Sequence, residues 1–85
     1  MAENIKYNPK LILNEIKWTD KFDLNKIIIY YLHRGAPNNI KILSGTEIGI
    51  IGKSFIETNN SHIPFHRILK IKYGDKILFD RNKLH

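Results

Sequence analysis

The sequence predicts an α+β fold, in which a short N-terminal helix packs on a strongly bent antiparallel sheet of five to six strands. This sheet is expected either to stay open or to curl towards a barrel. The chain of 85 residues has the size of one domain, so residues 1–85 are expected to fold as a unit. Its apolar fraction of 42% is enough for a core. One segment near the N-terminus has apolar residues at helical spacing. Several short runs of β-branched residues follow it, and turn residues lie between these runs.

The helix is expected near the N-terminus. Asn8 suits the N-cap, and Pro9 suits the first helical position because its missing N–H would have no partner there anyway. Ile12 and Ile16 then recur about one turn apart and give the helix an apolar stripe. Trp18 is expected to end the helix by packing against the core.

The strands are expected in the apolar runs between clusters of Gly, Pro, Asn and Ser. The first run is apolar over most of its length, which is typical of a strand buried on both faces. Gly52 and Lys53 separate two later runs, and glycine at the first loop position favours a type II′ turn. The expected strands are residues 26–33, 40–43, 47–51, 54–58, 63–73 and 76–81.

The hairpin between the last two strands has two candidate registers. A two-residue loop at residues 74–75 would place apolar residues opposite lysines. A three-residue loop at residues 73–75 instead pairs Ile71 with Ile77, and opposed residues share a face. We therefore expect the three-residue loop, which also pairs Leu69 with Phe79. The core expected from this register contains Ile28, Leu32, Leu69, Ile71, Ile77 and Phe79, covered by Ile16 and Trp18.

The formal net charge of +6 is unevenly spread along the chain. Residues 25–45 hold three cations and no acid, and residues 61–85 hold six cations against two acids. Clustered cations favour a polyanionic partner such as RNA, although the charge could also be incidental. The start of the chain lacks the pattern of a signal peptide, and no apolar run approaches the ~20 residues of a membrane span. We therefore expect a cytoplasmic protein without membrane contact.

Two His-Arg dipeptides at expected strand ends are candidates for anion binding. His33-Arg34 ends the first strand, and His66-Arg67 begins the closing hairpin. The arginine fork fits phosphate oxygens, and histidine can donate a hydrogen bond near neutral pH. The four side chains could therefore converge on one anion. Alternatively, each His is a solvated strand-end residue and each Arg pairs with an acid elsewhere in the chain.

Further cations and two aromatic side chains extend this candidate site. The expected register places three lysines on one face, aligned with His66, and places Arg67 opposite Arg81 at the end of the apolar face. Tyrosines beside cations on a sheet are typical of single-stranded RNA binding. The candidate RNA- or phosphate-binding residues are His33, Arg34, His66, Arg67, Lys70, Lys72, Lys76 and Arg81, with Tyr31 and Tyr73 for stacking on bases.

No metal, cofactor or catalytic residue is expected. The absence of cysteine excludes a disulfide scaffold, a thiolate zinc site and a cysteine nucleophile. His62 and His66 have a metal-ligand spacing on a helix, but Pro64 between them disfavours that helix. The serines lack the sequence context of an activated nucleophile.

Several motifs make the chain similar to a known family of small, mostly archaeal proteins. Leu-Asn-Glu-Ile-Lys-Trp stands at residues 13–18, Tyr-Leu-His-Arg-Gly-Ala-Pro at 31–37, Ser-Gly-Thr-Glu-Ile at 44–48 and Ile-Pro-Phe-His-Arg-Ile at 63–68. Together these motifs resemble the RNA cyclic group end recognition domain, a family formerly catalogued as uncharacterised. The closing pattern of that family often contains Trp-Asp-Arg, and Phe79 replaces the tryptophan here.

The resemblance implies an RNA-binding module that recognises phosphate-terminated RNA ends, in particular 2′,3′-cyclic phosphates, in RNA repair or processing. Its family motifs fall on the two His-Arg dipeptides. RNA is the implied partner, and RNA-processing or repair proteins are further candidates. Two alternatives remain at this point. One is a metal-independent RNA-end phosphoesterase that uses the same His and Arg residues, although we expect a binding protein rather than an enzyme. The other is a protein-interaction subunit whose basic charge is incidental.

Overall fold

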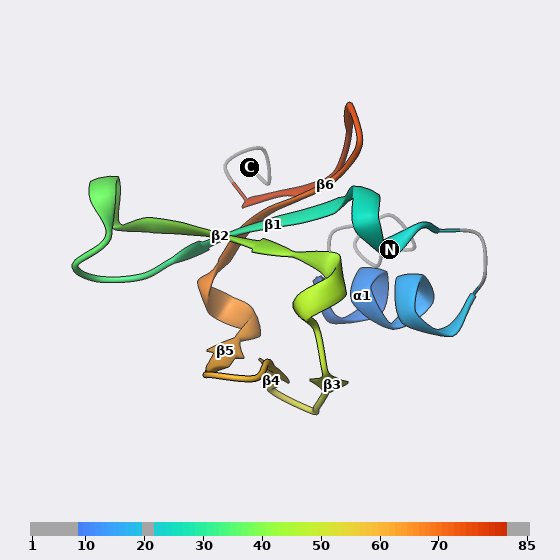
Figure 1. The fold of residues 1–85 in the computed structure, drawn as a ribbon, viewed down its shortest axis with the longest axis horizontal. Coiled ribbons are helices and arrows are strands. Elements are labelled where there is room, and N and C mark those ends of the chain that lie inside the picture. Colours follow the sequence, from blue (N-terminus) through green and yellow to red (C-terminus); the bar gives the residue numbers. More distant parts are fainter. Residues whose placement is uncertain (1–8, 20–21, 82–85) are drawn as a thin grey trace.

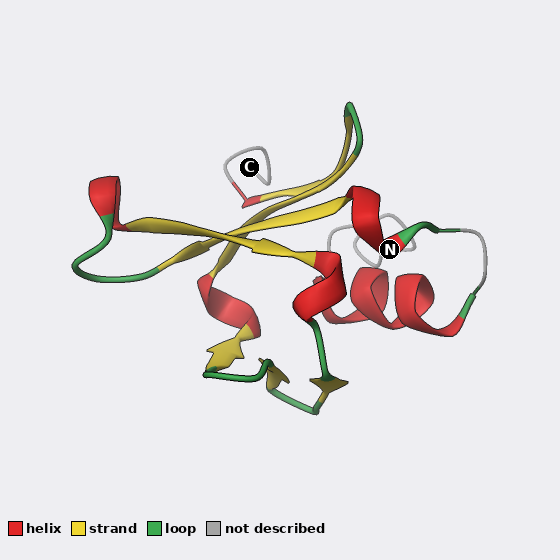
Figure 2. Ribbon diagram, in the orientation of Figure 1, coloured by secondary structure: helices red, strands yellow, loops and turns green. Residues whose placement is uncertain are grey.

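The computed structural model describes residues 9–19 and 22–81. A four-stranded antiparallel sheet with the order β2-β1-β6-β7 forms one layer, and a three-stranded sheet with the order β3-β4-β5 lies beside it. Figure 1 shows the helix α1 and the smaller sheet on the same side of the larger sheet, and Figure 2 marks the same elements by type. The elements are α1 (Pro9–Trp18), β1 (Ile27–Leu32), β2 (Ile40–Ser44), β3 (Ile50–Ile51), β4 (Phe55–Glu57), β5 (His62–Pro64), β6 (Ile68–Tyr73) and β7 (Lys76–Asp80).

The predicted α+β class is confirmed, but the sheet differs from the expected one. The described part of the chain forms seven strands in two sheets and no closed barrel. Four short 3₁₀ helices connect them: η2 (Leu24–Lys26), η3 (Pro37–Asn39), η4 (Gly45–Glu47) and η5 (Phe65–Arg67). Because η5 interrupts the run at residues 63–73, the long strand expected there becomes two strands in different sheets. None of the described helices is long and apolar enough to span a membrane.

The helix begins at Pro9 as expected, whereas Asn8 lies outside the described residues. Leu13 and Ile16 are its buried residues and face the core. Trp18 does not pack against the core, because 82% of its surface is exposed. The reason is geometric: each residue turns the helix by about 100°, so Trp18 points roughly 200° away from Ile16.

Strand β1 is buried on one face rather than on two. Ile27, Ile29 and Tyr31 are buried, while Ile28 is half-buried and Leu32 is exposed. The alternation arises because α1 and the smaller sheet cover a single face of the larger sheet (Figure 1). The expectation that Ile28 and Leu32 belong to the core is therefore wrong.

The closing hairpin uses the two-residue loop, so the three-residue register is wrong. Gly74 has a φ of 57°, which few residues other than glycine adopt. Lys72 lies opposite Ile77, which is the mixed pairing that argued against this loop. A β-bulge then shifts the register, so that Ile71 faces Phe79 and an apolar pair is restored.

A second bulge lies between β1 and β6. Tyr30 pairs with Lys70 while Tyr31 pairs with Ile68, which leaves Leu69 as the extra residue. Ile68 therefore fills the buried position expected for Leu69, which is half-buried. The observed core consists of Leu13, Ile16, Ile27, Ile29, Tyr31, Leu43, Ile48, Ile56, Ile63, Ile68, Ile71 and Phe79.

The segment that follows β2 is held by its own hydrogen bonds. Ser44 caps η4: its hydroxyl accepts from the Thr46 N–H, and its own N–H donates to the Glu47 carboxylate at 3.1 Å. Gly45 is required there, because a Cβ atom would lie 2.5 Å from the Cβ of Ile27. The Ser-Gly-Thr-Glu motif is thus explained by local structure.

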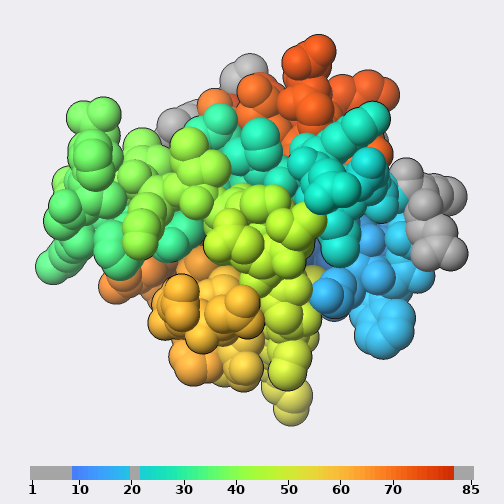
Figure 3. Space-filling model, in the orientation of Figure 1, coloured from blue at the N-terminus to red at the C-terminus, as the bar shows by residue number. Residues whose placement is uncertain are grey.

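The β3–β4 connection also differs from the expected turn. The Gly52 N–H donates to the Phe55 carbonyl oxygen at 2.8 Å, so the two residues between them, Lys53 and Ser54, form the loop. Gly52 is not among the residues with positive φ, which a type II′ turn with glycine first would need. The turn end of the β1–β2 hairpin projects beyond the rest of the molecule (Figure 1, Figure 3).

Candidate functional site

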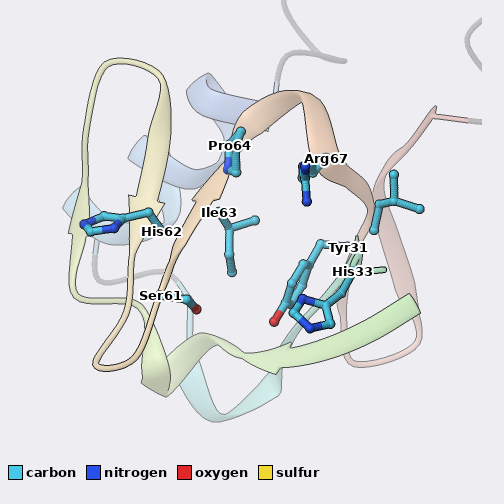
Figure 4. A pocket seen from close by; sticks show the side chains of 8 residues that line it. Tyr31, His33, Ser61, His62, Ile63, Pro64 and Arg67 are labelled. Carbon is cyan, nitrogen blue, oxygen red and sulfur yellow. The ribbon is translucent and has the colours of Figure 1, made fainter. Parts of the chain in front are cut away.

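A pocket of about 190 Å³ opens between the end of β1 and strand β5 (Figure 4). Two segments far apart in the sequence meet there, because η5 connects β5 directly to β6, which is the partner of β1 in the larger sheet. This surface, called the end pocket below, has both apolar and polar walls. Its lining residues are Tyr31, Leu32, His33, Ser61, His62, Ile63, Pro64 and Arg67.

Of the predicted phosphate-binding residues, His33 and Arg67 are the two that the structure brings together in the end pocket. Figure 4 shows both side chains directed into the hollow, with the Tyr31 ring beside His33. Those two rings meet edge to face with their centroids 6.2 Å apart. No Asp or Glu lines the end pocket, and no described carboxylate forms an ion pair with Arg67. Because no described carboxylate of the protein lines this pocket, the Arg67 guanidinium and the His33 imidazole are suited to bind an anionic ligand.

Arg34 and His66 do not line the end pocket, so the four dipeptide residues do not all converge. Both side chains are exposed. Arg34 directly follows His33, and His66 directly precedes Arg67. In a 3₁₀ helix successive residues turn by about 120°, so η5 directs His66 away from the side that Arg67 faces.

Arg81 has a structural role that its sequence position does not reveal. Its Nε donates to the Ile68 carbonyl oxygen at 2.8 Å, and its Nη2 donates to the Phe65 carbonyl oxygen at 3.1 Å. Its guanidinium also lies 5.3 Å from the centroid of the Phe79 ring. The half-buried Arg81 therefore bridges both ends of η5, the turn that carries Arg67. It does not face Arg67 across a strand pair, contrary to the expected register.

Ser61 and His62 line the end pocket although neither was a predicted site residue. The only sequence signal for them is their position a few residues before the second His-Arg dipeptide. The His62 imidazole points away from His33 (Figure 4). Its Nε2 lies 3.7 Å from the Glu57 carboxylate, and its ring meets Phe55 edge to face at 5.1 Å. Among the lining histidines, His33 alone directs its imidazole into the hollow.

Tyr31 is not the exposed stacking residue that was expected, because only 8% of its surface is exposed. It lies on the covered face of β1. Burial raises the pKa of its hydroxyl above the usual 10.0, and the negative charge of Glu47 adds to this effect. Tyr31 therefore forms a wall of the end pocket and presents no free ring face.

Tyr73 is likewise engaged within the fold. Its hydroxyl oxygen accepts a hydrogen bond from the Asp23 N–H at 3.0 Å, and its ring meets Phe22 edge to face at 5.0 Å. These contacts attach the segment after α1 to the end of β6. The expectation that Tyr73 is free to stack on bases is therefore not supported.

The three lysines expected in one row are divided between the two faces of the larger sheet. Lys70 and Lys72 lie on the face opposite the core. There the Lys70 amine is 5.7 Å from the centroid of the Tyr30 ring and 4.0 Å from the Asp80 carboxylate. Lys76 pairs with Tyr73 and so shares the other face. The two-residue loop and the bulge in β7 cause this difference. Within residues 9–19 and 22–81, no three His, Asp or Glu side chains gather as a metal site would require.

Comparisons with known proteins identify similar sequences over most of the chain. The family model described as the MJ1316 RNA cyclic group end recognition domain matches residues 7–81. A UPF0248 protein of Methanococcus vannielii is 49% identical over 63 residues, which cover 74% of this chain and 76% of the relative. A UPF0248 protein of Archaeoglobus fulgidus is 34% identical over 70 residues, covering 81% of this chain and 99% of the relative.

The similarity extends to the UPF0248 protein MJ1316 of Methanocaldococcus jannaschii. That protein is 36% identical over 63 residues, which cover 74% of this chain and 78% of the relative. No solved structure matches the chain significantly. The matched residues 7–81 include both His-Arg dipeptides and every residue of the end pocket.

Proposed function

Because the chain belongs to the family of the MJ1316 RNA cyclic group end recognition domain, we propose that it binds phosphate-terminated RNA ends, in particular 2′,3′-cyclic phosphates. The observation that carries this proposal is the joint position of His33 and Arg67 in a pocket without a carboxylate. The name of the family gives the class of ligand, and the end pocket offers a place for it.

The chemistry of a cyclic phosphate fits these groups. A 2′,3′-cyclic phosphate carries one negative charge on two non-bridging oxygens, and the Arg67 fork can donate an N–H to each of them. The His33 imidazole can donate a further hydrogen bond. Leu32, Ile63 and Pro64 then offer apolar surface to the ribose. A terminal hydroxyl would gain none of the charge-assisted hydrogen bonds.

Binding without turnover is favoured over phosphoesterase activity. Opening a cyclic phosphate without a metal needs a general base and a general acid on opposite sides of the phosphorus. In the end pocket His33 is the one histidine whose side chain faces the hollow, since His62 turns towards Glu57 and Phe55 (Figure 4). Incubation with uridine 2′,3′-cyclic monophosphate checks this point, and release of a 2′- or 3′-monophosphate would instead favour the enzyme.

A module that holds an RNA end without altering it acts most simply beside an enzyme that processes that end. We place the protein in RNA repair or processing on this ground, with RNA-processing or repair proteins as candidate partners. Pull-down from cell extract treated with ribonuclease would separate direct protein partners from partners joined through RNA.

The proposal is tested by comparing two RNA ends. An oligomer ending in a 2′,3′-cyclic phosphate should bind about tenfold more tightly than the same oligomer ending in a hydroxyl, a difference of about 1.4 kcal/mol. Charge-assisted hydrogen bonds contribute about 1.5–3 kcal/mol each, and solvent competition at an open pocket offsets part of this gain. Raising the salt concentration should weaken both complexes, while the preference decreases more slowly. Equal affinity for the two ends would contradict end recognition and would mean that the protein binds RNA only through its basic charge.

A further inference from the structure

The face of the larger sheet opposite α1 and the smaller sheet is an apolar surface edged by lysines. It is called the outer face below, and its principal residues are Tyr30, Leu32, Ile40, Ile42, Lys70 and Lys72. We propose that the outer face binds the unpaired nucleotides that precede the RNA end, an assignment that rests on the proposed function. The ligand class would then be a single-stranded 3′ overhang rather than a blunt duplex end.

Strand register places these side chains together. Tyr30 pairs with Ile42 and Leu32 pairs with Ile40 across β1 and β2, while Tyr30 pairs with Lys70 across β1 and β6. Opposed residues share a face, and residues two apart on one strand share it as well. All six side chains therefore lie on the outer face.

The outer face is exposed and yet apolar, whereas the solvent-facing side of an antiparallel sheet is commonly polar. Ile42 is 62% exposed, and Ile40 and Leu32 are exposed as well. No described element packs over them, because α1 and the smaller sheet both lie on the opposite side (Figure 1). A contiguous apolar patch with a polar rim marks an interaction site more often than isolated apolar residues do.

The charges around this patch favour a polyanion over a second copy of the chain. Lys70 and Lys72 lie two residues apart on the same face of β6, about 6.6–6.8 Å from each other. Both could therefore contact successive phosphates of one extended RNA backbone. Asp80, a carboxylate that pairs with Lys70 on the outer face, lies 4.0 Å from the Lys70 amine and is only 9% exposed. A chain with a net charge of +6 would repel its own copies, whereas phosphates would be attracted.

The outer face is continuous with the end pocket. Leu32 belongs to both, since it lies on the outer face at the end of β1 and also lines the end pocket. Tyr30 is two residues further along the strand, about 6.8 Å away. The end pocket lies on the covered side of β1, so a strand of RNA whose terminal phosphate occupies it would pass around the end of β1 at Leu32. It would then reach Ile42 and the Tyr30 ring, which Lys70 approaches to 5.7 Å from its centroid. In RNA-recognition motifs, another four-stranded sheet holds two or three bases in this manner.

Only unpaired bases can use such a surface. The faces of bases in a duplex are stacked on one another, so side chains cannot lie against them. Single-stranded bases stack on aromatic side chains such as Tyr30 with little sequence preference. We therefore expect affinity to depend on the presence of an unpaired overhang and to depend little on its sequence.

The test compares two ligands that share the same end. Uridine 2′,3′-cyclic monophosphate occupies only the end pocket, whereas an oligouridylate of about eight nucleotides with the same end also reaches the outer face. The wild-type protein should bind the oligomer more tightly. Ile42→Glu and Tyr30→Leu should each weaken oligomer binding fivefold or more, the lower end of what one lost base stack costs. Both variants should bind the mononucleotide as the wild type does.

Matched controls separate this proposal from others. Ile50→Glu introduces the same charge at a residue of the smaller sheet that is 61% exposed, compared with 62% for Ile42, and should leave oligomer affinity unchanged. Ile42→Gln repeats the substitution without added charge and should still weaken the oligomer complex. Pairing the oligomer with a complementary strand should remove its advantage over the mononucleotide.

Three results would overturn the assignment. The first is equal loss with Ile42→Glu and Ile50→Glu, which would indicate a general charge effect. The second is a change in self-association of Ile42→Glu, seen by sedimentation, without a change in RNA affinity, because the outer face would then bind protein. The third is that all outer-face variants keep the wild-type affinity for the oligomer while Arg67→Ala weakens the binding of both ligands. Phosphate binding in the end pocket would then stand without a role for the outer face. Failure of the proposed function differs from all three, because Arg67→Ala would then affect neither ligand.

Discussion

The Nη2 of Arg81 donates a hydrogen bond to the carbonyl oxygen of Phe65 at 3.1 Å, across sixteen positions of the chain. The same guanidinium holds the Ile68 carbonyl through Nε at 2.8 Å. These two carbonyls belong to the first residue of η5 and to the residue that follows it, and Arg67 enters the end pocket from this turn. Arg81 is thus a positioning residue for Arg67, although as a cation near a basic surface it resembles a direct phosphate ligand.

Replacing Arg81 should separate positioning from direct contact. Arg81→Ala removes two hydrogen bonds, although the Phe65 carbonyl keeps the one from the Ile68 N–H, and should lower the free energy of unfolding by about 1–3 kcal/mol. It should also reduce the preference for a cyclic end, because Arg67 loses its fixed position. The slope of log affinity against log salt should stay unchanged, since no phosphate contact is lost. A slope reduced by about one unit would mean that Arg81 binds phosphate itself.

Gly45 should tolerate no side chain. In Gly45→Ala the new Cβ would lie 2.5 Å from the Ile27 Cβ and 2.6 Å from the Leu24 carbonyl oxygen, and the latter is backbone that cannot rotate away. We expect a loss of about 1–3 kcal/mol in the free energy of unfolding, measured with urea. Gly52→Ala, whose nearest atom would be 3.3 Å away, is the milder control. Equal effects of the two substitutions would contradict the close packing at Gly45.

The bulge in β6 predicts which of its apolar residues contribute most to the free energy of unfolding. Ile71 is fully buried and Leu69 is half-buried, so Ile71→Ala should cost about 2–5 kcal/mol and Leu69→Ala clearly less. The three-residue register would instead make both residues equal members of the core. Urea unfolding of the two variants decides between these registers, and a larger loss for Leu69→Ala would show that the bulge is misplaced.

Much of the fold was predictable because it is encoded locally. Pro9 and the apolar spacing up to Ile16 define the helix, and β-branched runs define most strands. The two bulges were not predictable, because nothing in the sequence marks Leu69 in β6, or Leu78 between the paired Ile77 and Phe79 in β7, as an extra residue. The mixed pairing of Lys72 with Ile77 is tolerated only because the bulge limits it to one position.

The site was predictable in its residue types but not in its geometry. The His-Arg dipeptides drew attention to His33 and Arg67, yet the choice between neighbours depends on η5, which no periodicity reveals. The exposure expected for Tyr31 was wrong because strand β1 buries one face, and that face includes Tyr31. The same one-sided burial leaves its neighbour Tyr30 on the outer face, where it is half-buried.

Alkaline pH should destabilise the protein through Tyr31. Burial raises the pKa of its hydroxyl in the folded state above the usual 10.0, so the folded chain holds this proton more tightly than the unfolded chain. The stabilisation is complete below pH 10 and is lost as pH rises through the folded pKa. Tyr31→Phe cannot ionise, so its free energy of unfolding should fall less than that of the wild type between about pH 9 and pH 11. Parallel pH profiles of the two proteins would contradict this role.

The measurement that tests the end pocket most directly is the ratio of affinities for cyclic and hydroxyl ends in Arg67→Ala. We predict that this ratio falls from about ten to about one, while binding to the RNA backbone persists. Arg34→Ala removes the same charge from an exposed residue outside the end pocket and should keep the wild-type ratio. A ratio that survives in Arg67→Ala, or that disappears in Arg34→Ala, would contradict the claim that the end pocket holds the phosphate.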